Sequence, residues 1–93
     1  ILPPVIDTAS CTEVTGTALC GGCVVQLFSD NEEEGLFHEG TVYTDPSGHF
    51  EWTGSLQGPN LTATLIDPAG NTSQFSAPVI NACLYTYLPM IKK

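Results

Sequence analysis

Short runs of alternating apolar and polar residues fill the chain, and none of its segments has the apolar spacing of an amphipathic helix. The runs are rich in Val, Thr, Tyr, Phe and Leu, which favour strands. Clusters of Gly, Pro, Asn and Asp separate the runs at regular intervals, as in β-sandwiches and small barrels. The pattern predicts strands at 3–8, 12–18, 23–29, 36–44, 49–55, 61–66 and 73–79, with a further strand at 83–90.

The alternation also predicts which side chains face the core. Successive side chains of a strand point to opposite faces, so residues two apart share an environment. Phe50 and Trp52 are two positions apart, and both rings are therefore expected in the core, whereas Glu51 faces water. His49 and Thr53 are expected in water for the same reason. The other predicted core positions are Val25, Leu27, Leu61, Ala63 and Leu65.

Two tetrapeptides, DPSG at 45–48 and DPAG at 67–70, carry the same turn signal. In each, proline presets φ at the second position, the aspartate carboxylate caps the turn, and glycine accepts a positive φ. Both tetrapeptides are therefore predicted to form tight turns between neighbouring strands.

Charge excludes several classes of partner. The 93 residues form one domain with ten acidic side chains, two lysines and a net charge of −8. A chain with so few cations cannot neutralise phosphates, which excludes nucleic acid and disfavours anionic membranes. No stretch approaches the roughly 18 apolar residues that a membrane-spanning helix needs.

Four cysteines in a short chain indicate two disulfides and an oxidising, extracellular compartment. The alternative is a zinc site, because Cys20 and Cys23 have the C-x2-C spacing. A zinc ribbon needs a second close pair, however, and Cys11 and Cys83 are far apart in the sequence. The start of the chain lacks the pattern of a secretory leader, and we interpret it as a mature N-terminus or an excised piece.

Four stretches resemble bacterial immunoglobulin-like (Big-type) repeats of secreted and surface proteins: VTGTA at 14–18, VQLFSD at 25–30, GHFEWTGSL at 48–56 and NLTATLIDPAGNTSQFS at 60–76. The resemblance implies an all-β, immunoglobulin-like antiparallel β-sandwich of seven to eight strands. It also implies a non-enzymatic role as a stalk, spacer, adhesin segment or appendage subunit. We expect the sandwich to span 1–82 and an apolar C-terminal segment to span 83–93.

The resemblance further implies a disulfide pairing. Strands 12–18 and 73–79 of such a sandwich are expected side by side, which would bring Cys11 next to Cys83. Cys20 and Cys23 would then form a second, short-range disulfide at a turn.

No catalytic residue is predicted, and the chain is not expected to be an enzyme. His38 and His49 fall at strand positions that face solvent, and no nucleophile motif accompanies them. Paired carboxylates for glycoside hydrolysis would need a helix or a long loop that raises the pKa of one of them, and the pattern predicts neither.

An acidic loop at 29–35 is the one candidate for a cofactor, calcium. Carboxylates and backbone carbonyls gathered in one loop can coordinate Ca²⁺. The spacing of an EF-hand loop is absent, and a solvated acidic loop is the alternative interpretation. The candidate ligands are Asp30, Glu32, Glu33 and Glu34.

Exposed aromatic side chains on a secreted sandwich raise carbohydrate binding as a further alternative, because aromatic rings stack on sugars. The same rings are also ordinary packing residues. The candidates are Phe28, Phe37, Tyr43, Tyr85 and Tyr87.

The C-terminal segment carries most of the functional prediction. It combines apolar and aromatic side chains with the only two lysines of the chain. It can pack on its own sandwich or on a neighbouring copy, where the lysines would meet the acidic loop and 1–6 would join the interface. Our hypothesis is a self-assembling subunit of a bacterial surface filament or appendage. The alternative is a monomeric glycan- or calcium-binding accessory or spacer domain. The predicted interface residues are Leu84, Tyr85, Tyr87, Leu88, Met90, Ile91, Lys92 and Lys93.

Overall fold

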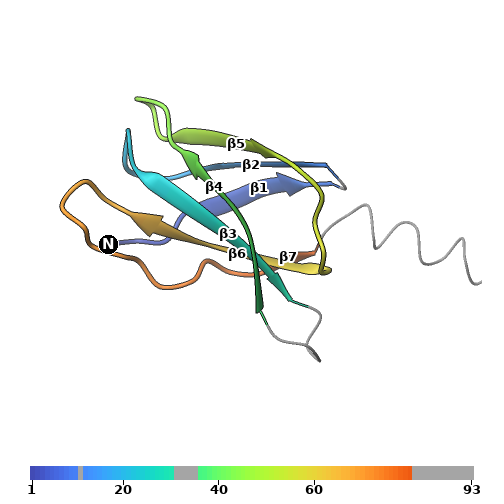
Figure 1. Ribbon diagram of the computed structural model, residues 1–93. Helices are drawn as coiled ribbons and strands as arrows, with labels where there is room; N and C mark the ends of the chain where they lie inside the picture. Colours follow the sequence, from blue (N-terminus) through green and yellow to red (C-terminus); the bar gives the residue numbers. More distant parts are fainter. Residues whose placement is uncertain (11, 31–35, 81–93) are drawn as a thin grey trace, which may run out of the picture.

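The computed structural model describes residues 1–10, 12–30 and 36–80, and this part of the chain contains strands and turns but no helix (Figure 1). The predicted all-β fold class is confirmed. No helix long and apolar enough to cross a membrane occurs in the described ranges. The strands are β1 (Val5–Ala9), β2 (Glu13–Thr17), β3 (Val24–Asp30), β4 (Leu36–Tyr43), β5 (His49–Thr53), β6 (Asn60–Ile66) and β7 (Val79–Ile80).

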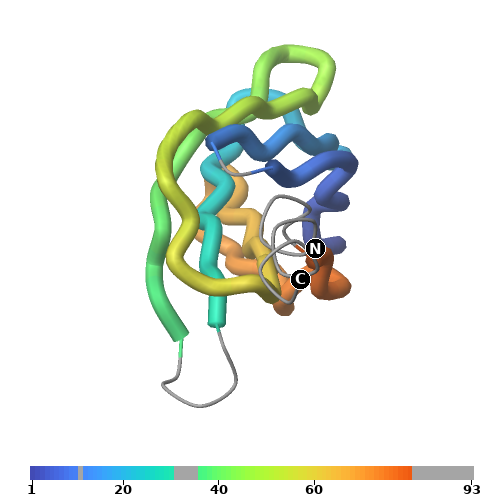
Figure 2. Tube along the Cα trace, turned by 90° about the vertical axis from the view of Figure 1, so that its right-hand side faces the viewer, coloured from blue at the N-terminus to red at the C-terminus, as the bar shows by residue number. Residues whose placement is uncertain are grey.

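The strands form two antiparallel sheets, with the orders β1-β2-β5 and β4-β3-β6-β7. Figure 2 shows β1 and β2 (blue) on one side of the molecule and β3 and β4 (teal and green) on the other. The two sheets form the predicted immunoglobulin-like sandwich, in which the first, second and fifth strands share one sheet.

The core lies between the sheets and follows the predicted alternation. Every predicted core residue is buried except Trp52, which is half-buried and packs against the core from its margin. Phe50 lies opposite Gly16 in the register, and a Cβ at Gly16 would collide with the Phe50 ring. This glycine therefore makes room for the largest fully buried side chain. The buried apolar residues are Ile6, Ala9, Val14, Cys23, Val25, Leu27, Phe50, Leu61, Ala63 and Leu65.

Both predicted tight turns are confirmed. At the first of them, the Asp45 carboxylate accepts hydrogen bonds from the backbone N–H groups of Ser47 and His49, each at 2.9 Å. Gly48 closes the turn with φ of 92°. Hydrogen bonding to the ionised form, most strongly from the Ser47 side chain, lowers the pKa of Asp45.

The predicted strand at 73–79 is wrong. The chain after β6 pairs with β6 as a strand only at β7, and an isolated bridge joins Ile66 to Thr72. Between them, the Ser73 hydroxyl accepts the Leu65 N–H at 2.9 Å, while the Ser73 N–H donates to the Leu65 carbonyl at 2.8 Å. Ser76 makes the same two bonds with Ala63. Two serine hydroxyls thus take the place of backbone carbonyls beside β6.

The disulfide between Cys20 and Cys23 is confirmed. The reasoning behind the other pairing is contradicted, because β2 pairs with β1 and β5 whereas 72–80 runs beside β6 in the opposite sheet. Cys11 and Cys83 themselves lie outside the described residues, and their pairing stays a prediction. The boundary between 1–82 and 83–93 also falls there.

Candidate functional site

One end of the sandwich exposes large apolar side chains. Their exposed fractions are 57% for Ile1, 65% for Leu2, 58% for Val5 and 86% for Leu19. Single exposed apolar residues are ordinary, but neighbouring ones mark a contact surface. We call these four residues the apolar end.

A rigid turn holds Leu19 at this end. The chain before it is fixed by the Ala18 N–H, which donates to the Gly48 carbonyl at 2.8 Å. The chain after it is fixed by the Cys20–Cys23 disulfide and by Thr44, whose buried hydroxyl donates to the Cys20 carbonyl at 2.7 Å. The backbone on both sides of Leu19 is therefore fixed in a position that exposes its side chain.

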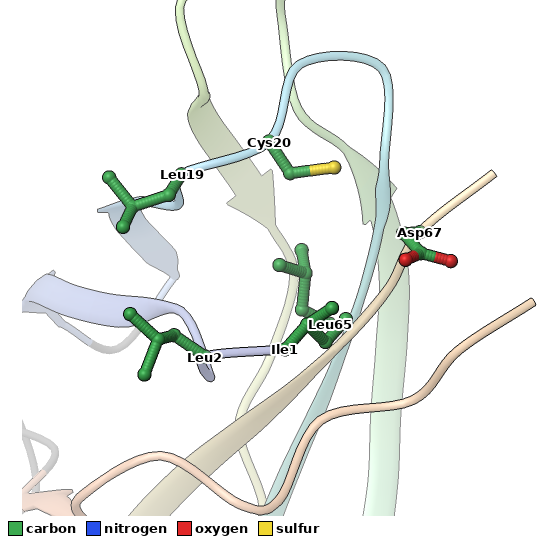
Figure 3. A pocket seen from close by; sticks show the side chains of 6 residues that line it. All are labelled: Ile1, Leu2, Leu19, Cys20, Leu65 and Asp67. Atoms are coloured by element: carbon green, nitrogen blue, oxygen red, sulfur yellow. The ribbon is translucent and has the colours of Figure 1, made fainter. Parts of the chain in front are cut away.

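Two shallow hollows lie beside Leu2 and Leu19. The first has a volume of about 310 Å³, and the buried side chain of Leu65 contributes to its lining. In Figure 3, Leu2 and Leu19 stand on one side of this hollow and Asp67 stands on the other. The second hollow, of about 410 Å³, extends over Val5 and Ser47. The first hollow is lined by Ile1, Leu2, Leu19, Cys20, Leu65 and Asp67.

Asp67 gives the first hollow a negative rim. Its carboxylate accepts hydrogen bonds from the backbone N–H groups of Ala69 and Asn71, at 3.0 and 2.9 Å, and from the Asn71 side chain at 3.1 Å. These bonds, led by that of the Asn71 side chain, lower the pKa of Asp67. The carboxylate therefore stays ionised at neutral pH.

The first hollow lies at one end of the four-stranded sheet. The other end of this sheet carries the start of the acidic loop, Asp30, and the last described residue, Ile80. Asp30 pairs with Asn60, and Asn60 pairs in turn with Ile80. The hollow, in contrast, lies where Leu65 and Asp67 stand at the other end of β6. In Figure 1 the N-terminus and β7 accordingly lie toward opposite ends of the sandwich.

The calcium prediction falls largely outside the described residues. Of its four candidate ligands, only Asp30 is described, and its carboxylate lies 3.4 Å from the Asn60 side-chain nitrogen. Within the described ranges, no three His, Cys, Asp or Glu side chains gather as a metal site would require. The prediction for Glu32, Glu33 and Glu34 stays open.

The predicted aromatic candidates are divided between the two faces of the four-stranded sheet. Phe28 and Tyr43 are on the outer face, where Phe28 packs edge-to-face against His38 and Phe75 at centroid distances of 5.3 and 5.4 Å. Phe37 pairs with the buried Ser29 in the register and so faces the other way. Phe75, which sequence reasoning missed, is half-exposed. Tyr85 and Tyr87 lie outside the described residues, as does every predicted interface residue from Leu84 to Lys93.

A partly buried polar cluster was also missed by sequence reasoning. Glu39 is the extra residue of a β-bulge in β4, and its carboxylate accepts the Ser29 hydroxyl and the Gln57 N–H. The Gly58 N–H donates to the Ser29 hydroxyl at 3.0 Å. Bulges redirect side chains, and this one holds the connection from β5 to β6 in place.

Comparisons of the chain with protein-family models and with curated protein sequences find no match. The candidate site therefore rests on its own geometry.

Proposed function

We propose that the protein is a non-enzymatic, extracellular structural subunit that assembles head to tail, with the C-terminal segment 83–93 as the contact to the next copy. The observation that supports this proposal is the position of the apolar end. It lies opposite Ile80, after which the chain continues into the apolar segment. Donor and acceptor at opposite ends of a subunit make a contact that does not close on itself, and such contacts build filaments.

The energetics favour burial of both surfaces. Full burial of a large aliphatic or aromatic side chain contributes about 1.5–3 kcal/mol relative to water. Six of the eight residues from Leu84 to Ile91 are of this kind, and so are the four residues of the apolar end. Association also costs translational and side-chain entropy, so several of these side chains must be buried together in one contact.

An extracellular location is supported by the Cys20–Cys23 disulfide, because such bonds persist in oxidising compartments. The acidic composition fits assembly from soluble subunits, since a net charge of −8 keeps them apart in solution until specific contacts form.

Electron microscopy and light scattering of the purified chain test the proposal. Wild-type protein at high concentration, without reducing agent, is expected to form regular fibres. A variant that lacks 84–93 is expected to stay monomeric with an unchanged melting temperature. A wild-type chain that stays monomeric at every concentration would refute the proposal, and so would a truncated chain that polymerises equally well.

A monomeric glycan-binding module is the second candidate, favoured by the outer-face aromatics Phe28, Tyr43 and Phe75. It predicts saturable binding of soluble oligosaccharides that is lost in Tyr43→Ala and Phe75→Ala. Titration calorimetry with both variants, set against wild-type protein, separates this candidate from self-assembly.

A further inference from the structure

We infer that the hollow beside Leu19 is the receptor for the C-terminal segment of a second copy, with Lys92 and Lys93 lying next to Asp67. This inference rests on the proposed head-to-tail assembly and adds the residues that accept the segment. Three observations support it: the apolar lining of the hollow, the charge at its rim, and its place on the sandwich.

The lining matches an apolar peptide better than a small polar ligand. Leu65 and Cys20 contribute buried or half-buried surface, while Leu2 and Leu19 stand exposed beside them. A volume of about 310 Å³ is at the lower limit of small-molecule sites, which enclose their ligands. A shallow hollow of this size suits a few side chains presented by another polypeptide. The apolar segment 84–91 can present leucine, tyrosine, methionine and isoleucine side chains.

The charges are complementary. Lys92 and Lys93 are the only side-chain cations apart from histidine, and they directly follow the apolar residues of the segment. Among the described residues that line the first hollow, Asp67 is the one with an ionised side chain. A lysine has a long apolar stem with a charged tip. Its stem can therefore lie along the apolar wall while its ammonium group reaches the carboxylate at the rim.

The position of the hollow favours a second copy over the chain's own segment. Ile80 is in register with Asn60, and Leu65 is five residues further along β6. At the strand rise of about 3.3 Å per residue, these two positions are separated by roughly 17 Å. The chain's own segment would have to reverse direction and run back over this distance. The segment of a neighbour placed head to tail approaches the hollow directly.

Two variants test the acceptor. Leu19→Glu places a charge in the hollow at a side chain that is 86% exposed, so the fold should tolerate it. Leu36→Glu is the matched control, because Leu36 is 52% exposed and begins β4 at the opposite end of the sheet. Leu19→Glu is expected to weaken assembly by more than about tenfold, as the loss of one buried leucine predicts. Leu36→Glu is expected to assemble like wild type.

Mixing then identifies the occupant. Leu19→Glu protein retains its C-terminal segment, and the variant lacking 84–93 retains its hollow. At concentrations between the Kd of wild type and the weakened Kd of Leu19→Glu, each variant alone is expected to be monomeric. An equimolar mixture is expected to give a one-to-one dimer by light scattering. A mixture that stays monomeric would overturn the inference. If wild type forms fibres and Leu19→Glu forms them equally well, the acceptor is wrong although the proposed function stands. If wild type never assembles, the proposed function itself fails.

Charge reversal tests the ion pairs. Asp67→Asn keeps an oxygen that can cap the turn and removes the charge. It is expected to raise the Kd of the mixed dimer by about two- to fivefold, the effect of an exposed ion pair. Asp67→Lys is expected to weaken the dimer further, and Lys92→Glu with Lys93→Glu on the other partner is expected to restore it. If the Kd of the mixed dimer is unchanged by all three sets of substitutions, Lys92 and Lys93 do not take part in the contact.

Discussion

Substitution of Ser73 and Ser76 tests whether their hydroxyls attach the segment that follows β6 to the edge of that strand. Ser73 and Ser76 are 8% and 6% exposed, and each hydroxyl accepts a backbone N–H of β6 at 2.9 Å. The donors belong to Leu65 and Ala63, which are themselves buried at 2% and 0% exposure. Replacing either serine with alanine removes this acceptor. The backbone N–H group of Leu65 or Ala63 is then left unsatisfied in the protein interior.

An unsatisfied buried donor costs about 1–3 kcal/mol. Ser73→Ala and Ser76→Ala are each expected to lower the free energy of unfolding by this amount. For a domain of this size, each kcal/mol lowers the melting temperature by about 4–8 °C. The two substitutions affect different donors, so their effects should add in the double variant to within about 0.5 kcal/mol.

Urea unfolding followed through the fluorescence of Trp52, the single tryptophan, measures these changes. The midpoint should fall while the slope stays constant, because the surface exposed on unfolding does not change. Ser55→Ala is the matched control, since Ser55 is exposed, and its effect should stay within about 0.5 kcal/mol. If both buried serines behave like Ser55, their hydroxyls do not act as ladder acceptors and our description of this edge is wrong.

Two further predictions follow from the turns and from Trp52. A Cβ at Gly40 would collide with the indole nitrogen of Trp52, so Gly40→Ala should cost about 1–3 kcal/mol, as overpacking does. The cost should shrink in a Trp52→Phe background, and thermal unfolding followed by circular dichroism that shows equal costs in both backgrounds would contradict this contact. In the folded protein the pKa values of Asp45 and Asp67 lie below the ordinary value of 3.8. The two ionised carboxylates therefore stabilise the folded state above pH 3.8. This contribution to the free energy of unfolding declines as the pH falls through the lowered pKa values. The difference in melting temperature between wild type and Asp67→Asn should therefore narrow as the solution is acidified below pH 3.8, and a difference independent of pH would refute the assignment.

The connection between β5 and β6 shows where sequence reasoning stops. Alternation predicts that residues on β4 point in and out in turn, and it cannot show that Glu39 is an extra, bulged residue. The bulge turns this carboxylate toward Ser29 and Gln57. A bulge of this kind depends on two strands pairing out of step, which is a property of the pair and not of either segment.

For the candidate site, too, some features are visible in the sequence and others only in the structure. The apolar character of the first six residues and of 84–91 is visible in the sequence, and so is the separation of the two lysines from most of the acidic residues. The sequence pointed to the acidic loop as the acceptor of those lysines. Asp30, Asn60 and Ile80, however, lie side by side at one end of the sheet, while Asp67 and the apolar hollow lie at the other.

The sequence by itself determined the strand faces and the two Asp-Pro turns, because a period of two and turn-forming residues act locally. It also determined the all-β class, because these local signals leave a sandwich or a small barrel. The choice of a sandwich between these two came from the resemblance to immunoglobulin-like repeats. Only the tertiary structure decided that serine hydroxyls replace part of a strand and that Leu19 stands over a hollow beside Asp67. These features join residues far apart in the chain, and their positions depend on how the two sheets pack together.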